Sequence, residues 1–247
     1  MNILLAEAAE VAGDLLEVVG DRANHIVKVL RARPGDVLRC GIVGGAMGHG
    51  EIIALSEKHP RRALIRLTLD TSPPVVSPID FVVALARPIM MRRLCSQLTS
   101  LGIGELHVID TSRVEKSFWH SSFIKEKEYL QHLRRGLEQA VDTRLPDVSF
   151  HPSFPRFVAD ILPGLVPRYQ AMIFAHPGAS SFSPASLVQP GGRYLLFIGP
   201  EGGWRDVEIA ALTSQGCRPA SLGNRILRVD TAAIALHARV SQLLAAE

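Results

Sequence analysis

Residues 195–204 read Leu195-Leu196-Phe197-Ile198-Gly199-Pro200-Glu201-Gly202-Gly203-Trp204, an apolar run that passes directly into a glycine-rich loop. The run predicts a buried strand, and the glycines allow backbone angles and close approaches that other residues forbid. The loop has neither the Lys-Ser/Thr pair of a Walker motif nor the glycine spacing of a dinucleotide-binding loop. Its glutamate would repel a phosphate, so we expect a less anionic ligand or a cationic one. A plain tight turn between a strand and a helix stays open as an alternative.

A second stretch lies nearer the C-terminus and reads Ser221-Leu222-Gly223-Asn224-Arg225-Ile226-Leu227-Arg228-Val229-Asp230-Thr231-Ala232-Ala233. It follows a short apparent strand and leads into a final helix that Asp230 or Thr231 is expected to cap. Arginine pairs with phosphate through two-pronged hydrogen bonds. Taken alone, the stretch is better explained as a surface loop with solvated arginines.

Outward from these loops, strand and helix patterns alternate over the rest of the C-terminal part. The predicted strands are 80–86, 106–109, 171–175 and 194–198, and the predicted helices are 91–101, 130–141, 207–212 and a last one from about 230. Alternation of this kind is typical of an α/β fold, a mostly parallel sheet with helices on both faces. Ligands in such folds bind at the carboxyl ends of the strands.

A proline-rich segment, residues 71–78, separates this part from the N-terminal one. Its three prolines cannot continue a helix or a central strand. We therefore predict two domains, residues 1–72 and 73–247. The first has strand patterns at 37–43, 51–55 and 63–69, with glycine-rich residues 44–50 between the first two, and a short helix at 26–30. A small β-barrel is the natural closure for so few strands.

Composition limits the classes of protein that fit the chain. With 47% hydrophobic and 21% charged residues over 247 positions, it is expected to fold as an ordinary globular protein. The formal net charge of +3 is too small to indicate a polyanionic partner by itself. Three widely spaced cysteines form neither a disulfide framework nor a zinc motif, which favours a reducing cytoplasm. An acidic N-terminus argues against a signal peptide, and we expect no membrane span and no metal.

Together, the two loops resemble one family: the ribosomal small-subunit RNA methyltransferases that methylate N3 of a uridine. The shared order is strand, Gly-Pro-Glu-Gly-Gly, short helix, strand, Leu-Gly-x-Arg-Ile-Leu-Arg and terminal helix. This family belongs to the SPOUT superfamily, so the resemblance implies a trefoil-knotted sheet near the C-terminus, preceded by a small PUA-like β-barrel that binds RNA. It also implies S-adenosylmethionine as cofactor, ribosomal RNA or the small ribosomal subunit as partner, and a homodimer whose interface includes the apolar last helix.

The resemblance assigns roles to particular residues. Cofactor binding is implied for Ile198, Gly199, Pro200, Glu201, Gly202, Gly203, Leu222, Gly223, Arg225, Ile226, Leu227 and Arg228. Residues 25–31 match the family's His-x-x-x-Val-Leu-Arg stretch, and residues 22–39 contain five Lys or Arg against one acid, a local charge of +4. RNA contacts, mostly to phosphates, are therefore expected from Arg22, His25, Lys28, Arg31 and Arg33, together with Arg87 and Arg113.

The expected reaction is a direct transfer of a methyl group from sulfur to the base nitrogen. We expect Arg228 to stabilise the uridinate that forms when N3 loses its proton, because a guanidinium stays charged at any working pH. Glu201 is the catalytic candidate for accepting that proton, with Asp230 as the other possibility.

Some positions depart from the family pattern. Gln97 and Ser100 stand where the family has lysine and glutamate, Arg87 stands where it has a lysine, and the spacing from Gln139 to Arg144 is longer by two. Two alternatives therefore stay open: the same fold acting on another RNA position, such as a ribose 2′-hydroxyl, or an RNA-binding relative without catalysis. A nicotinamide-dependent oxidoreductase is disfavoured because no GxGxxG loop is present.

Overall fold

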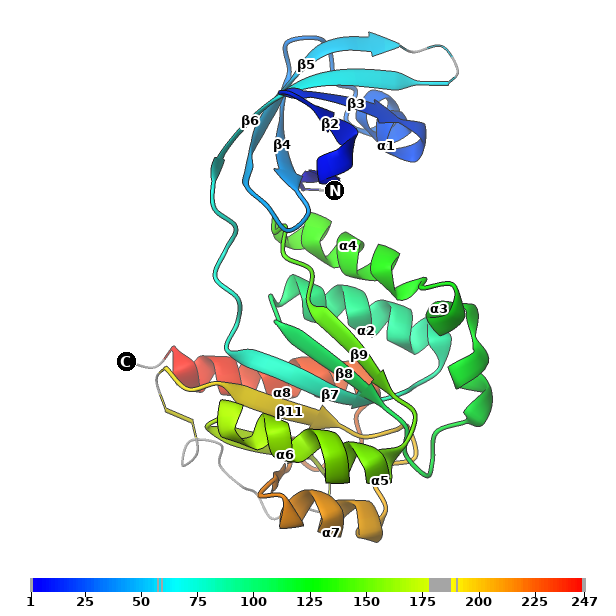
Figure 1. The fold of residues 1–247 in the computed structure, drawn as a ribbon, viewed down its shortest axis with the longest axis vertical. Helices are drawn as coiled ribbons and strands as arrows, with labels where there is room; N and C mark the ends of the chain where they lie inside the picture. The colour runs from blue at the N-terminus through cyan, green and yellow to red at the C-terminus, as the bar shows by residue number, and fades with distance from the viewer. Residues whose placement is uncertain (1, 57, 59, 178–187, 190, 246–247) are drawn as a thin grey trace. The chain divides into compact units, whose positions relative to one another are not determined.

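The computed structural model describes residues 2–56, 58, 60–177, 188–189 and 191–245 (Figure 1). The chain forms two compact units, residues 1–75 with 134–145, and residues 76–133 with 146–247. In the described part of the chain, no helix is both long enough and apolar enough to cross a lipid bilayer.

The first unit is built on a six-stranded sheet in the order β1-β4-β5-β6-β3-β2. β1 pairs with β4 in parallel, and the other neighbours pair antiparallel. Alternating side chains such as Leu16, Val18, Ile52 and Ile65 are buried in its core. The strands are β1 (Leu4–Ala6), β2 (Val11–Ala12), β3 (Leu15–Val19), β4 (Val37–Ile42), β5 (Met47–Ser56) and β6 (Arg62–Thr71), and the helical turns are η1 (Ala8–Glu10), α1 (Gly20–Asn24) and η2 (His25–Val29).

The glycine-rich stretch 44–50 differs from the prediction, since β5 already begins at Met47. Gly44, with a φ of 73°, and Gly45 lie in the turn before β5, whereas Gly48 and Gly50 are needed for close strand pairing. A Cβ on Gly48 would lie 2.0 Å from the carbonyl oxygen of Thr68, and one on Gly50 would lie 2.6 Å from Cys40 Sγ. The predicted short helix at 26–30 is confirmed by η2, whereas strands β1 to β3 were not predicted.

Residues 134–145 also differ from the prediction, which placed them in the second domain. They include the end of α4 (Tyr129–Ala140), and the structure assigns them to the first unit. Leu137 is buried with Ile3 and Leu5. The backbone N–H of Asn2 donates to the carbonyl of Glu138 at 2.9 Å, and that of Gly44 donates to the carbonyl of Thr143 at 2.7 Å. Contacts between residues more than 90 positions apart cannot be read from local sequence patterns.

The second unit has a six-stranded sheet in the order β12-β10-β11-β7-β8-β9, and every pairing among the described strands is parallel. Its strands are β7 (Ile79–Ala84), β8 (Glu105–Ile109), β9 (Asp147–His151), β10 (Ala171–Ala175), β11 (Tyr194–Ile198) and β12 (Arg218–Ala220). Its helices are α2 (Pro88–Ser100), η3 (Lys116–His120), α3 (Ser122–Lys125), the start of α4, α5 (Phe154–Arg156), η4 (Phe157–Ile161), α6 (Leu162–Leu165), η5 (Val166–Arg168), α7 (Asp206–Ser214) and α8 (Val229–Leu244).

Helices cover both faces of this sheet (Figure 1). Along β7, Phe81 and Val83 pack into one core with side chains of α2 and α8, whereas Val82 and Ala84 pack into another with side chains of α5 to α7. Such strands are buried on both sides, which explains their continuous apolar sequences. The predicted α/β fold with a parallel sheet between two helical layers is confirmed.

The last helix begins one residue before the predicted caps. α8 starts at Val229, with Arg228 in extended conformation at the N-cap position. Asp230 lies inside the first turn, where its carboxylate accepts from the N–H of Thr231 at 2.9 Å and pairs with Arg93 at 3.2 Å. Asp230 therefore lies inside the helix and not at the N-cap position, which Arg228 occupies.

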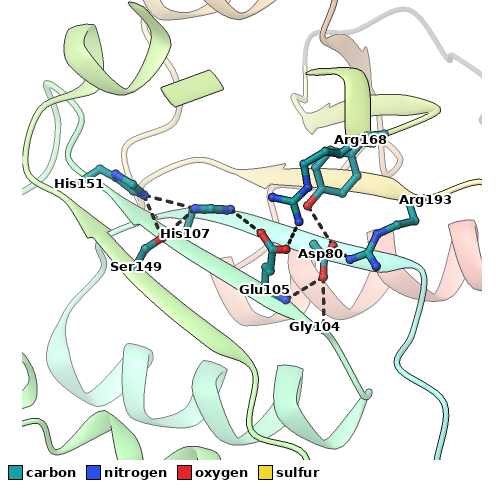
Figure 2. A network of polar contacts seen from close by, with 9 residues as sticks. Asp80, Gly104, Glu105, His107, Ser149, His151, Arg168 and Arg193 are labelled. Atoms are coloured by element: carbon teal, nitrogen blue, oxygen red, sulfur yellow. Dashed lines mark hydrogen bonds and ion pairs between the residues drawn. The ribbon is translucent and has the colours of Figure 1, made fainter. Parts of the chain in front are cut away.

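A buried carboxylate holds the amino ends of three strands together (Figure 2). Asp80 of β7 is fully buried and accepts from the N–H groups of Gly104 and Glu105, at 3.0 and 2.8 Å, before and at the start of β8. It also accepts from the hydroxyl of Tyr169 at 3.0 Å and pairs with Arg193, which precedes β11. A buried charge needs such partners, and these fix the end of the sheet opposite the carboxyl ends.

Candidate functional site

A cavity of about 710 Å³ lies beyond the carboxyl ends of β10, β11 and β12. Residues after β11 and residues after β12 both contribute to its wall. All twelve predicted cofactor residues line it: Ile198, Gly199, Pro200, Glu201, Gly202, Gly203, Leu222, Gly223, Arg225, Ile226, Leu227 and Arg228. The structure therefore brings together two sequence motifs that were singled out separately.

Other lining residues were not predicted as part of this cavity. They come from the start of α2, the end of β10, the loop after β11 and the start of α8, and are Arg87, Ile89, Met90, Ala175, His176, Pro177, Trp204, Val229 and Ala232. Arg87 was predicted only as an RNA contact. The rule that ligands bind at strand carboxyl ends would have indicated residues 175–177 once β10 was predicted. Gln139 and Arg144, whose spacing departs from the family, are not among the described lining residues.

A tryptophan packs closely against the loop after β11 and fixes its conformation. A Cβ on Gly199 would lie 2.9 Å from the Trp204 ring, so only glycine permits this approach. The indole N–H of Trp204 donates to the carbonyl of Ala175 at 3.2 Å, which links the loop to the end of β10. Gly203 has a positive φ of 74°, and its N–H closes a turn onto the carbonyl of Pro200 at 2.8 Å. The glycines are thus required by the geometry of the loop.

The charged groups on the cavity wall carry opposite signs. Glu201 Oε2 lies 3.3 Å from Arg87 Nε, with the two side chains 42% and 67% exposed, so this ion pair is weak and open to exchange. Arg225 and Arg228, which follow β12, are exposed and also line the cavity. Asp230, the other predicted proton acceptor, is buried and paired with Arg93, and it is not among the described lining residues.

The predicted RNA-binding residues of the first unit differ in their surroundings. Lys28, Arg31 and Arg33 are exposed, and His25 is partly exposed. Arg22 is engaged within the chain, because its guanidinium pairs with Glu10 and donates to the carbonyl of Leu5 at 2.9 Å. Glu10 in turn has its pKa held below its usual value, mainly by the hydrogen bond from Arg22. Arg22 therefore has a structural role that the charge pattern did not reveal.

These features define an α/β protein with a ligand cavity at the carboxyl ends of its parallel strands and a separate β-rich unit. Comparison with known families is consistent with both parts: residues 73–241 match the RNA methyltransferase domain, and residues 20–61 match the RNA methyltransferase PUA domain. The chain belongs to the RNA methyltransferase family, which confirms the resemblance drawn from the two loops.

Individual relatives match along most of the chain. The protein named ribosomal RNA small subunit methyltransferase E of Treponema pallidum is 29% identical over 237 residues, covering 95% of this chain and 88% of the relative. Its namesake in Mycobacterium bovis is 27% identical, over 90% of this chain and 84% of the relative. Among solved structures, a Legionella pneumophila methyltransferase in complex with S-adenosylmethionine superposes with a TM-score of 0.74 at 24% identity, covering 99% and 97% of the two chains. An rRNA methyltransferase from Porphyromonas gingivalis gives 0.77 at 22%, covering 99% of each chain, so the fold is shared.

Proposed function

We propose that this protein transfers a methyl group from S-adenosylmethionine to N3 of a uridine in the RNA of the small ribosomal subunit. The observation that carries the proposal is the convergence of residues 198–203 and 222–228 on one cavity. The names of the relatives support small-subunit ribosomal RNA as the substrate. Work on that RNA would place the protein in the cytoplasm.

The cavity suits this cofactor in size and chemistry. Its volume lies within the range of roughly 300–1,000 Å³ that is common for small-molecule sites. Ile198, Leu222 and Leu227 offer apolar wall for a flat base, and Gly199 and Gly202 allow close approach of the backbone. The carboxylate of Glu201 is compatible with a cationic ligand. When bound, S-adenosylmethionine would supply a methyl group on a positively charged sulfur, and the twelve lining residues predicted from the sequence would hold it.

Two side chains are assigned to the chemistry on the base. Arg228, exposed at the N-cap of α8 and on the cavity wall, would stabilise the negative charge that develops on the uracil ring. Glu201 would accept the N3 proton, because it is the carboxylate among the described lining residues and its pair with Arg87 is exposed, whereas Asp230 is buried and engaged with Arg93. Alignment of the two bound substrates would supply much of the rate.

RNA would be held mainly through its phosphates. The proposed contacts are His25, Lys28, Arg31 and Arg33 of the first unit and Arg87 at the edge of the cavity. Phosphate contacts of this kind weaken steeply with added salt. Binding of a small-subunit RNA fragment at increasing salt concentrations would therefore measure how many of these cations participate.

The trefoil knot and the homodimer are part of the same proposal. The knot is carried over from the family resemblance; in the structure, the chain after β12 continues through residues 221–228 to α8, which packs with α2 against the sheet. Two apolar side chains of the cavity wall are exposed, Ile89 at 65% and Ile226 at 88%, and a second copy would cover them. Molecular mass in solution tests the dimer, since a 26.9 kDa species at all concentrations would rule it out.

The function is tested in two steps. Calorimetric titration with S-adenosylmethionine measures binding, and incubation with small-subunit RNA followed by nucleoside analysis identifies the product. N3-methyluridine is the expected product. A ribose-methylated nucleoside would show the alternative target. Cofactor binding without any methylated RNA, from either free RNA or assembled subunits, would favour the RNA-binding relative.

A further inference from the structure

A buried carboxylate outside the cavity wall connects two segments of the second unit. Glu208, on the first turn of α7, is 3% exposed. Its Oε1 accepts from the backbone N–H and from the hydroxyl of Ser112, both at 2.8 Å. Its Oε2 accepts from the N–H of Arg205 at 2.8 Å. One side chain therefore ties the turn after β8 to the end of the loop after β11.

The residue next to Ser112 reaches the cavity loop directly. The Arg113 guanidinium donates to the carbonyl of Gly202 and, at 3.4 Å, to that of Gly203. The stem of Arg113 also packs against the loop, because a Cβ on Gly202 would lie 3.0 Å from Arg113 Cδ. Both glycines line the cavity. Arg113 thus contacts the same loop residues that line the cavity.

We propose that Glu208 is a positioning residue that acts through the Ser112–Arg113 turn to keep residues 199–205 in their ligand-binding conformation. We call Glu208, Ser112 and Arg113 together the latch. In it Arg113 binds the loop and does not serve as an RNA contact. The proposal deepens the proposed function and rests on it for the identity of the ligand. A carboxylate is required because it accepts three hydrogen bonds at once on two oxygens. A glutamine has a single acceptor oxygen, so either Ser112 or Arg205 would lose its partner.

The test compares Glu208→Gln and Arg113→Ala with two matched controls. Asp206→Asn removes an exposed acid from the same helix turn, and Lys116→Ala removes an exposed cation three residues after Arg113. The first measurement is amide hydrogen exchange of residues 199–205 in the ligand-free protein. The second is the dissociation constant of S-adenosylmethionine without RNA. The third is the dissociation constant of a small-subunit RNA fragment.

Glu208→Gln and Arg113→Ala are expected to speed exchange in the loop and to weaken cofactor binding about tenfold, the size of one lost charged hydrogen bond. Both variants should bind RNA with the affinity of the wild type. The two control variants should match the wild type in all three measurements. In turnover, KM for S-adenosylmethionine should rise while kcat at saturation changes little, and Arg113→Lys should restore part of the affinity. If Glu208→Gln does not fold, Ser112→Ala removes one hydrogen bond and gives the same comparison.

Two results would contradict this proposal, and a third would contradict the proposed function on which it rests. Normal cofactor affinity with weakened RNA binding in Arg113→Ala would make Arg113 an RNA contact and overturn the latch. Unchanged amide exchange of residues 199–205 in Glu208→Gln would mean that Glu208 only caps α7 and does not position the loop. Absence of cofactor binding in the folded wild type would overturn the proposed function instead, while the exchange measurement would still decide whether the latch exists.

Discussion

Arg228 is the residue proposed to stabilise the anion that forms on the uracil ring. It lies on the cavity wall, and its backbone carbonyl accepts from the N–H of Ala232 at 2.8 Å, which anchors it to α8. Arg228→Ala is expected to lower methyl transfer about a hundredfold or more, the usual cost of removing a donor that stabilises a developing anion. Cofactor affinity should change much less.

The comparison needs a control arginine away from the cavity. Arg218 is exposed at the start of β12 and is not among the described lining residues, so Arg218→Ala should leave transfer unchanged. Single-turnover kinetics with bound cofactor separate the chemical step from binding. Full transfer by Arg228→Ala would remove the residue from the mechanism.

Gly203 offers a prediction about backbone strain in the cavity loop. Its φ of 74° costs an L-residue about 1 kcal/mol or more, while a Cβ there would meet nothing closer than 3.8 Å. Gly203→Ala is therefore expected to weaken cofactor binding by strain alone. Gly216→Ala is the matched control, because Gly216 has a φ of 83° and open space in the turn between α7 and β12. Titration calorimetry of both variants should show a loss of affinity only at Gly203.

Among single residues, the sequence predicts those that belong to a contiguous motif. The glycines and arginines of the two loops were found because both motifs are contiguous. The pairing of Arg22 with Glu10 was not predicted because Glu10 lies on another element, and the contact of Glu208 with Ser112 was not predicted because the two residues are 96 positions apart. Ion pairs and hydrogen bonds between distant segments leave no periodic signal.

Among the elements, β8 and β9 carry a histidine cluster on one face of the sheet (Figure 2). The hydroxyl of Ser149 lies 2.7 Å from His107 Nδ1 and 3.0 Å from His151 Nε2, and the two ring nitrogens are 3.3 Å apart. Burial lowers the pKa of His107, although Glu105 opposes this, and burial together with the nearby His107 lowers the pKa of His151. Both rings therefore favour their neutral forms in the folded protein.

The lowered pKa values of the two histidines predict that the stability of the protein depends on pH. The unfolded chain binds protons near pH 6.5, whereas the folded chain resists them, so the unfolded state takes up more protons as the pH falls. The free energy of unfolding is expected to be level above about pH 7 and to decrease below about pH 6.5. Burial lowers the pKa of His237 as well, which adds to the same trend.

Denaturant titrations between pH 5.5 and 7.5 measure this effect. His151→Asn should flatten the dependence, since it removes one of the two adjoining rings. His120→Asn should not, because His120 is exposed on η3. Equal slopes in the wild type and His151→Asn would mean that the cluster contributes nothing to the dependence.

The elements that sequence patterns predicted are those with long apolar runs. β7, β10 and β11 are buried on both faces, so their identity was clear from a few residues. β5 was cut short in the prediction because Gly48 and Gly50 resemble a loop, while the structure uses them to bring the strands close. Glycine in a strand is ambiguous until its neighbours across the sheet are known.

For the whole molecule, the assignment of residues 134–145 to the first unit has a testable consequence. A fragment of residues 1–75 lacks Leu137, which is fully buried with Ile3 and Leu5. It also lacks the ion pair of Arg134 with Glu7 at 2.6 Å and the hydrogen bond from Thr143 Oγ1 to the carbonyl of Gly45 at 2.6 Å. Removing a buried leucine side chain alone costs about 2–5 kcal/mol, a large part of the stability of a small domain.

We therefore expect the 1–75 fragment to unfold at a lower temperature alone than in the presence of a synthetic peptide of residues 134–145. The peptide stabilises by binding only the folded fragment, so the midpoint should rise with peptide concentration. A Leu137→Ala peptide is the control and should raise it much less, because its methyl group cannot fill the space beside Ile3 and Leu5. Circular dichroism at several peptide concentrations gives the midpoints. An unchanged midpoint with both peptides would mean that the segment does not stabilise the separate fragment, which contradicts the prediction.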